Sequence, residues 1–207
     1  MKPVLIVIAG PNGAGKTTVT ERLRRDHWSE GVDYLNPDEV ARDRYGDWNS
    51  PVAVLEAARW TSARREQLLA ARKGLAFETV FSAPDKLDFV RRASESGYFV
   101  RVFFVGTANP MINASRIARR VIAGGHSVPI DRVVSRYGKS IAQLRAVVPL
   151  AHRVYVFDNS VDDCPARLRA RTVNGALRKL YLPVPHWLED LVERVPRHQE
   201  FEAVSDE

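Results

Sequence analysis

A glycine-rich stretch near the N-terminus constrains this chain most: GPNGAGKTT at positions 10–18, directly after the apolar run VLIVIA at 4–9. The stretch matches the pattern G-x-x-x-x-G-K-[ST], in which glycines let successive backbone N–H groups point at a polyphosphate. The β-branched run before it is typical of a buried parallel strand, and the residues after it predict a helix. Strand, loop and helix together predict a P-loop that binds a nucleoside triphosphate.

The residue types in this loop suit a magnesium-bound phosphate chain. Lys16 brings a point charge within reach of the β- and γ-phosphates, and the Thr17 hydroxyl is placed to ligate the Mg²⁺ that bridges them. The positive end of the following helix dipole favours the same anion. We expect the phosphates to be held by nine consecutive residues, Gly10, Pro11, Asn12, Gly13, Ala14, Gly15, Lys16, Thr17 and Thr18.

The composition sets the broad class of the protein. A chain of 207 residues with 45% hydrophobic content can bury one sizeable core. A single cysteine, Cys164, cannot form an internal disulfide. No stretch approaches the roughly 20 apolar residues that span a bilayer, and the N-terminal apolar run is too short for a signal peptide. We therefore expect a cytoplasmic protein without a membrane segment.

The charge balance is basic, with a formal net charge of +6. Arginines lie along the predicted helices with acidic residues scattered among them, and neither a basic tail nor an aromatic-interleaved patch is evident along the sequence. This distribution favours phosphate-binding arginines and solvated faces over a dedicated nucleic-acid surface. Nucleic-acid binding stays an alternative.

The first 160 residues alternate between strand and helix patterns. Strands are predicted at 32–35, 75–81, 99–105 and 154–160 in addition to the first strand, and prolines mark the starts of the helices between them. This order predicts an α/β fold, a P-loop NTPase three-layer sandwich with a five-stranded, mostly parallel sheet. Residues 1–160 are expected to form the core of this fold.

The C-terminal residues 161–207 are expected to pack on the same domain. The stretch 166–182 alternates around Asn174-Gly175, a dipeptide typical of two-residue β-hairpins. A short helix is predicted at 185–194, and the tail after Pro196 is expected to be mobile.

Asp38 is the first candidate on the acceptor side of the site. It follows the second predicted strand in the turn Asn36-Pro37-Asp38. In an open parallel sheet we expect the tip of that strand beside the phosphate loop, at the carboxyl edge where ligands bind. Asn36 and Asp38 would then face a substrate. The alternative is that Asp38 is a helix-start carboxylate in water.

Glu78 lies inside the otherwise apolar third strand, next to Thr79. A carboxylate there is costly unless it is paired, bound to metal or located at the catalytic end of the strand. The 99–105 strand ends without an aspartate, so the second metal ligand must lie elsewhere. Glu78 is therefore a candidate metal ligand alongside Thr17, the alternative being an edge-strand carboxylate in solvent.

Residues 110–148 are expected to form a helical lid. Two helices meet at Gly124-Gly125, and each carries arginines one turn apart. These arginines, Arg116 and Arg120 on the first helix and Arg132 and Arg136 on the second, could close over phosphates or be ordinary surface charges. His126, beside the glycines, is either a substrate contact or a turn residue bonded to backbone.

Taken in order, the segments GPNGAGKTT, NPDEVA, FETVFS and ARRVIAGGHSVP resemble the zeta-toxin family of small P-loop kinases. The resemblance covers about residues 1 to 160. It implies a phosphotransferase that uses ATP and Mg²⁺ to phosphorylate a hydroxyl of a small molecule, which is UDP-N-acetylglucosamine in the best known members. It also raises an antitoxin protein as a partner.

The resemblance implies roles for individual residues. Lys16 would be the phosphate-binding lysine, Asp38 the carboxylate that accepts the hydroxyl proton, and Glu78 a substrate- or metal-side carboxylate. Arg120 with Arg132 or Arg136 would face the γ-phosphate. The implied substrate-binding residues are Asn36, Asp38, Glu78, Thr79 and His126. Two alternatives stay open: a nucleoside or polynucleotide kinase, and an ATP-binding regulatory module that phosphorylates no small molecule.

Overall fold

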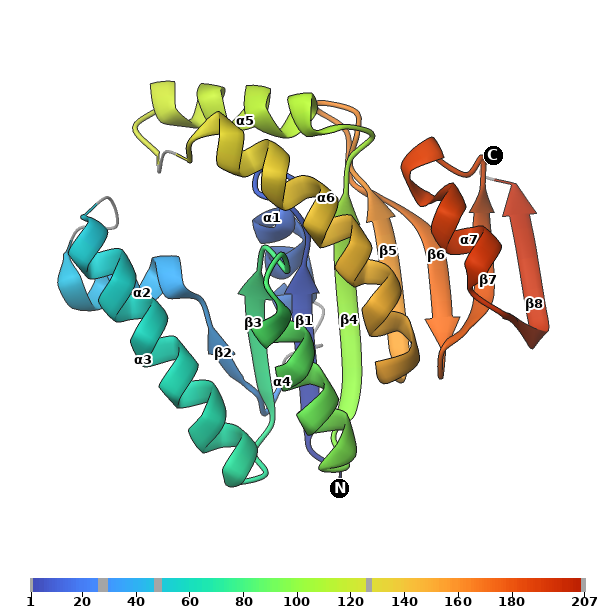
Figure 1. Cartoon of the computed structure of the whole chain (residues 1–207), viewed down its shortest axis with the longest axis horizontal. Coiled ribbons are helices and arrows are strands. Elements are labelled where there is room, and N and C mark those ends of the chain that lie inside the picture. The colour runs from blue at the N-terminus through green and yellow to red at the C-terminus, as the bar shows by residue number, and fades with distance from the viewer. Residues whose placement is uncertain (1, 26–29, 47–49, 126–127, 206–207) are drawn as a thin grey trace.

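A computed structural model describes residues 2–25, 30–46, 50–125 and 128–205. These residues form one twisted sheet in the order β2-β3-β1-β4-β5-β6-β7-β8 (Figure 1). The strands are β1 (Val4–Ala9), β2 (Asp33–Leu35), β3 (Leu75–Thr79), β4 (Phe99–Gly106), β5 (Arg153–Asp158), β6 (Arg167–Val173), β7 (Ala176–Leu182) and β8 (Arg197–Ser205). The predicted α/β fold with a mostly parallel sheet is confirmed, but the sheet has eight strands rather than five.

Helices alternate with the first five strands as predicted. They are α1 (Lys16–Arg25), α2 (Pro37–Tyr45), α3 (Pro51–Ala70), α4 (Pro84–Glu95), α5 (Pro110–Ile122), α6 (Ile130–Val147) and α7 (Glu189–Arg194), with short 3₁₀ turns at Val148–Leu150 and His186–Leu188. Proline at the first position fixes several of these starts. Asn36, Ser50 and Asn109 precede three of them and accept backbone N–H bonds as N-caps.

The position of β2 differs from the expected one. β3 pairs with β1 in parallel, and β2 lies outside β3 at the edge of the sheet. A strand buried along most of its length, like β3, belongs in the interior of a parallel sheet, whereas the three-residue β2 with its exposed Asp33 suits an edge. The register aligns Glu78 with Ile8, so Glu78, not the tip of β2, lies on the strand adjacent to the phosphate loop.

Helices cover the two faces of the sheet unequally. One apolar cluster joins the sheet to α4, α6 and α7 through Phe89, Leu144 and Leu191. On the other face, Leu23 of α1 packs against Ile8 and its neighbours. Figure 1 shows α4, α6 and α7 in front of the sheet, α1 behind it, and α5 above the carboxyl ends of the strands. The three-layer arrangement is therefore present over the central strands, and α5 and α6 are the two helices of the segment predicted to be a lid.

The C-terminal residues extend the sheet. β6 and β7 form the predicted hairpin, with Asn174 and Gly175 at φ values of 46° and 83°, as a tight two-residue turn requires. The prediction that the tail is mobile is wrong, because residues 197–205 form β8 and pair in parallel with β7. Without β8, the backbone groups along the outer edge of β7 would lack partners. None of the helices within the described ranges is long and apolar enough to cross a membrane.

Candidate active site

The phosphate loop has a backbone that only glycine permits at three positions. Gly10, Gly13 and Gly15 have φ values of 144°, 75° and 92°. A Cβ on Gly10 would lie 2.1 Å from the carbonyl oxygen of Val105 at the end of β4, and one on Gly13 would lie 2.6 Å from the carbonyl oxygen of Asn113. The glycines are therefore required by close neighbours as well as by the curl of the loop.

Two asparagines from distant parts of the chain hold the loop carbonyls. The side-chain amide of the fully buried Asn113, on α5, donates to the carbonyl of Asn12 over 2.6 Å. The amide of Asn159, which follows β5, donates to the carbonyl of Ala14 over 2.8 Å. These bonds keep the loop carbonyls engaged, so the N–H groups are left to face a ligand.

A chain of hydrogen bonds connects the second lid helix to the loop. Tyr137 on α6 donates its hydroxyl to the carbonyl of Thr107 over 2.6 Å, and the Thr107 hydroxyl donates to the side-chain oxygen of Asn113. Thr107 and Asn113 are both fully buried. The base of the lid is thus tied to the phosphate loop through Asn113. No sequence motif marks these residues, and only the fold brings them together.

Lys16 lies against its own loop. Its ammonium group donates to the carbonyls of Gly10 and Pro11 over 2.9 Å and 3.0 Å. An ammonium group has three donors, and the bonds found among the described residues use two of them. The third donor and the positive charge are available to a phosphate oxygen at the mouth of the loop.

The charges that act on Lys16 come from three other elements. Burial lowers the pKa of Lys16 to about 8, Glu78 on β3 and Asp38 on α2 oppose this shift, and Arg120 on α5 adds to it. The structure thus brings four of the predicted residues, Lys16, Asp38, Glu78 and Arg120, into one electrostatic neighbourhood. Two carboxylates and two cations at the carboxyl edge of a parallel sheet suit phosphate chemistry.

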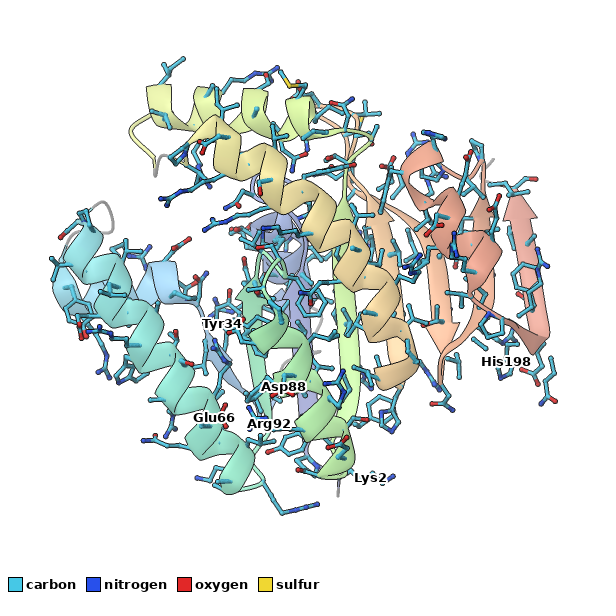
Figure 2. The ribbon with its side chains drawn as sticks, in the orientation of Figure 1. Lys2, Tyr34, Glu66, Asp88, Arg92 and His198 are labelled. Carbon is cyan, nitrogen blue, oxygen red and sulfur yellow. The ribbon has the colours of Figure 1, made fainter. Side chains whose placement is uncertain are left out.

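Glu78 is a bonded carboxylate, not one in solvent. Thr20 on α1 donates its hydroxyl to Oε1 over 2.6 Å, and Tyr34 on β2 donates to the same oxygen over 2.8 Å (Tyr34 is labelled in Figure 2). Burial and the adjacent carboxylate raise the pKa of Tyr34, which keeps the phenol protonated and donating. The sequence did not indicate Thr20 or Tyr34, because their contact with Glu78 depends on the strand order.

The acceptor-side turn is built around Asn36. Its side-chain oxygen accepts from the N–H of Asp38 over 3.0 Å, and its amide donates to the Tyr34 hydroxyl over 3.3 Å. Asn36 therefore connects the start of α2 to the Glu78 network. Asp38 is exposed at that helix start, where a molecule from solvent can reach it.

Two other predicted residues have local roles in the structure. The Thr79 hydroxyl accepts from the N–H of Phe81 over 3.0 Å, in a turn where Phe81 has a φ of 56°. The third strand therefore ends at Thr79, whereas the prediction extended it to residue 81. His126 lies outside the described residues.

The lid arginines differ in their relation to the loop. Arg120 is one of the groups that shift the pKa of Lys16. Arg132 and Arg136 lie on α6, one exposed and one half-buried, and among the charges of the described ranges neither belongs to the groups that shift it. Arg116, one turn before Arg120, bonds to the carbonyl of Asn159 over 2.8 Å instead of facing the loop. Of these four arginines, Arg120 is therefore the one whose charge shifts the pKa of Lys16.

The donor set at the loop fits a magnesium ion. Mg²⁺ in nucleotide sites takes one or two protein oxygens and completes its shell with phosphates and water. The Thr17 hydroxyl is exposed in the first turn of α1, and Glu78 is adjacent to the strand that leads into the loop. Within the described ranges no group of three or more His, Cys, Asp or Glu side chains could hold a metal ion.

Comparison with known sequences finds one matching family profile and a relative of low identity. The family profile described as zeta toxin matches residues 1–162. An uncharacterized protein of Haemophilus influenzae is 27% identical over 137 residues, which cover 66% of this chain and 94% of that protein.

Solved structures share the fold at low identity. A chain of the PezAT chromosomal toxin-antitoxin system of Streptococcus pneumoniae has a TM-score of 0.56 at 15% identity, over 80% of this chain and 70% of that one. A chain of the AvrRxo1-ORF1:-ORF2 structure with ATP has a TM-score of 0.62 at 15% identity. That match covers 96% of this chain but 64% of the neighbour, so this chain spans just under two thirds of its length.

Proposed function

Because the chain belongs to the zeta toxin family, we propose that it is a P-loop kinase that transfers the γ-phosphate of ATP to a hydroxyl of a small molecule. The observation that carries this proposal is the convergence of Lys16, Asp38, Glu78 and Arg120 from four different elements. A loop that only binds a nucleotide needs the lysine and the backbone. The exposed Asp38 on the acceptor side adds a group that a transfer reaction requires.

On the donor side, phosphoryl transfer depends mainly on positioning and on neutralising charge. The loop N–H groups and Lys16 hold the β- and γ-phosphates. Arg120 adds positive charge at the transferring group when the lid lies over it. Thr17 and Glu78 would hold a Mg²⁺ ion, which would neutralise charge on the phosphates.

On the acceptor side, Asp38 accepts the hydroxyl proton as the acceptor oxygen attacks the γ-phosphorus. The new O–P bond forms while the bond from phosphorus to the bridging β–γ oxygen breaks, and ADP leaves with that oxygen. Asn36 positions Asp38 by capping α2. Thr20 and Tyr34 fix Glu78 through Oε1, which keeps Oε2 available to metal or substrate.

The acceptor we propose is an anionic nucleotide sugar such as UDP-N-acetylglucosamine. Arginines border the acceptor side: the Arg24 guanidinium lies 5.2 Å from the Tyr34 ring centre, and that of Arg44 lies 4.1 Å from the Trp60 ring centre. Their charges suit the diphosphate of such a molecule. The same charges suit a nucleoside or polynucleotide acceptor, which stays the second candidate.

We also propose that a protein partner controls the enzyme. One structural neighbour comes from a toxin-antitoxin system and another from a complex of two open reading frames.

The eight-stranded sheet supports the proposal that residues 161–207 pack on the same domain as residues 1–160.

The test is an acceptor screen with ATP, Mg²⁺, UDP-sugars, nucleosides and 5′-hydroxyl oligonucleotides. Mass spectrometry should find one small acceptor that gains a phosphate while an equal amount of ADP forms, and Lys16→Ala should abolish both. A phosphorylated oligonucleotide instead would support the polynucleotide kinase. ATP binding without transfer to any acceptor would contradict the kinase and favour a regulatory module.

A further inference from the structure

One side chain of the C-terminal segment reaches the strands that support the donor site. After β7 the chain forms a 3₁₀ turn and α7, which lie beyond residue 162, where the match to the family profile ends. Leu188 and Leu191 are buried in the apolar cluster on the same face of the sheet as α4 and α6. They anchor this segment and place the half-buried Trp187 against the sheet.

Trp187 contacts the ends of two adjacent strands. β4 and β5 pair in parallel, and their register aligns Gly106 with Asp158, the last residue of each strand. The indole N–H of Trp187 donates to Oδ1 of Asp158 over 2.9 Å. The indole ring lies so close to Gly106 that a Cβ there would be 2.4 Å from Cη2 of the ring. A residue outside the family profile therefore holds the two strand ends side by side.

The Asp158 carboxylate connects Trp187 to the start of the lid. The Ser160 hydroxyl donates to the same Oδ1 over 2.5 Å, and its oxygen accepts the backbone N–H of Ala108 over 2.8 Å. A hydroxyl has one proton to donate and can accept as well, so both bonds form together. Ala108 lies in the segment between β4 and α5. The turn at residues 158–160 is thus fixed to Trp187 on one side and to the lid connection on the other.

The middle residue of this turn, Asn159, holds the phosphate loop. Its backbone N–H donates to the carbonyl of Gly106, and its own carbonyl accepts from Arg116, both over 2.8 Å. Its side-chain amide donates to the carbonyl of Ala14 over 2.8 Å. A Cβ on Gly15 would lie 2.4 Å from the same amide nitrogen. The position of Asn159 therefore determines where two consecutive residues of the phosphate loop lie.

The contacts form one route from the C-terminal segment to the donor site. A hydrogen bond to a carboxylate is stronger than one between neutral groups, so the indole N–H restrains Asp158 effectively. Without it, the end of β5 can shift, and Asn159 shifts with it. Small displacements matter in a site whose groups are preorganised. We propose that Trp187 is a positioning residue for ATP, which acts through Asp158 and Asn159 on the phosphate loop.

This inference rests on the proposed function, because it takes ATP as the ligand of the loop. A contact that only stabilises the fold would leave ATP binding by the folded protein unchanged. Leu191 provides the matched control, since it is buried in the same segment but its side chain is apolar and makes no hydrogen bond. Substitutions at Trp187 and Leu191 therefore separate positioning of the loop from stability of the segment.

The experiment measures the dissociation constant of ATP with Mg²⁺ by calorimetry, without an acceptor. Trp187→Phe keeps a ring over Gly106 but removes the N–H, so it should weaken ATP binding about 3- to 10-fold. Asp158→Asn weakens the same bond from the carboxylate side and should weaken ATP binding as well. Leu191→Ala leaves a cavity and should lower the urea midpoint of unfolding more than Trp187→Phe does. It should change ATP affinity by less than about 2-fold.

Two further measurements test the route. In an Asn159→Ala background, Trp187→Phe should weaken ATP binding by less than about 2-fold more, because both changes act on the same contact. With the acceptor found by screening, Trp187→Phe should raise the KM for ATP while kcat and the KM for the acceptor change less.

Unchanged ATP affinity in Trp187→Phe would overturn the inference, as would an equal loss in Leu191→Ala or additive losses in the double variant. ATP binding without transfer to any acceptor would contradict the kinase proposal alone. Absence of ATP binding by the unmodified chain would overturn both.

Discussion

The phosphate loop and the acceptor side lie at the same edge of the sheet but differ in how firmly their neighbours fix them. Around the loop, Gly13 is in close contact with the backbone of Asn113, and buried or partly buried amides hold the carbonyls of Asn12 and Ala14. On the acceptor side, the capping bond from Asn36 locates an exposed Asp38. The donor half is thus preorganised by packing, whereas the acceptor half has room to adapt to its ligand.

This difference has a chemical consequence. The donor ATP is the same whatever the acceptor is, so a rigid phosphate loop does not limit which acceptor is used. Its rigidity reduces the conformational entropy that is lost when ATP binds. The acceptor varies between kinases, and the proposed base, Asp38, is exposed on α2. The comparison predicts that substitutions in the two halves will have different signatures.

The largest effect is expected at Asp38. Asp38→Asn keeps the size and the helix start but removes the base, so turnover should fall about 10²–10⁴-fold. Steady-state kinetics with the acceptor found by screening measure it. Asp43→Asn, which changes an exposed carboxylate on the same helix, should leave turnover near its original value. If turnover fell by a similar factor in Asp43→Asn, the loss of negative charge on α2 would explain the effect, and Asp38 would not be the base.

Gly13→Ala tests the rigidity of the donor half. The positive φ and the 2.6 Å approach to the Asn113 carbonyl should make this variant lose about 1–3 kcal/mol of unfolding free energy and most of its ATP binding. Gly138→Ala is the control, since its Cβ would meet nothing within 4 Å in the interior of α6. It should gain about 0.5–1 kcal/mol. Urea denaturation measures the unfolding free energy of both variants. Equal changes in the two would refute the proposal that close packing fixes the phosphate loop.

The lowered pKa of Lys16 predicts a pH dependence of ATP affinity. Its free-protein pKa is about 8 because burial disfavours the charge, and bound phosphates hold the proton on the amine. Affinity should be flat below pH 8 and fall up to about tenfold per pH unit above it. Calorimetric titrations in buffers of different ionisation enthalpy would detect the proton uptake. Asp38→Asn should move the break to lower pH, since Asp38 raises this pKa, and a flat profile up to about pH 9.5 would contradict the assignment.

The smallest effect is expected at the ion pair between Glu66 on α3 and Arg92 on α4. Glu66 accepts two bonds from Arg92 over 2.7 Å and 2.8 Å, but both side chains are about half exposed (Figure 2). Glu66→Gln should therefore cost less than about 1 kcal/mol. Arg92 lowers the pKa of Glu66, so this contribution is present at neutral pH and disappears as the pH falls through the lowered value. Chemical denaturation at neutral and acidic pH measures it, and a difference that persists in acid would exclude the ion pair as its source.

Local patterns in the sequence were sufficient to predict some parts of the molecule. The phosphate loop is one continuous segment whose glycines, lysine and flanking strand each have a local physical reason. The hairpin at Asn174-Gly175 was predictable for the same reason. Glu78 could be singled out because an unpaired carboxylate in an apolar strand is costly.

Long-range contacts explain what the sequence did not predict. The bond from Tyr34 to Glu78 requires β2 and β3 to be neighbours, and the bond from Thr20 requires β3 to lie beside β1. Asn113 reaches the loop from about 100 positions away. The pairing of β8 with β7 likewise depends on an edge that only the folded sheet creates.

The ATP dissociation constants of Lys16→Ala and Asp38→Asn, measured side by side at neutral pH, test the division into donor and acceptor halves most directly. Lys16→Ala should bind ATP much more weakly, because it removes a cation at the phosphates. Asp38→Asn should bind ATP as the unmodified protein does while its turnover is lost. Equal weakening in both variants, or full turnover by Asp38→Asn, would contradict the account.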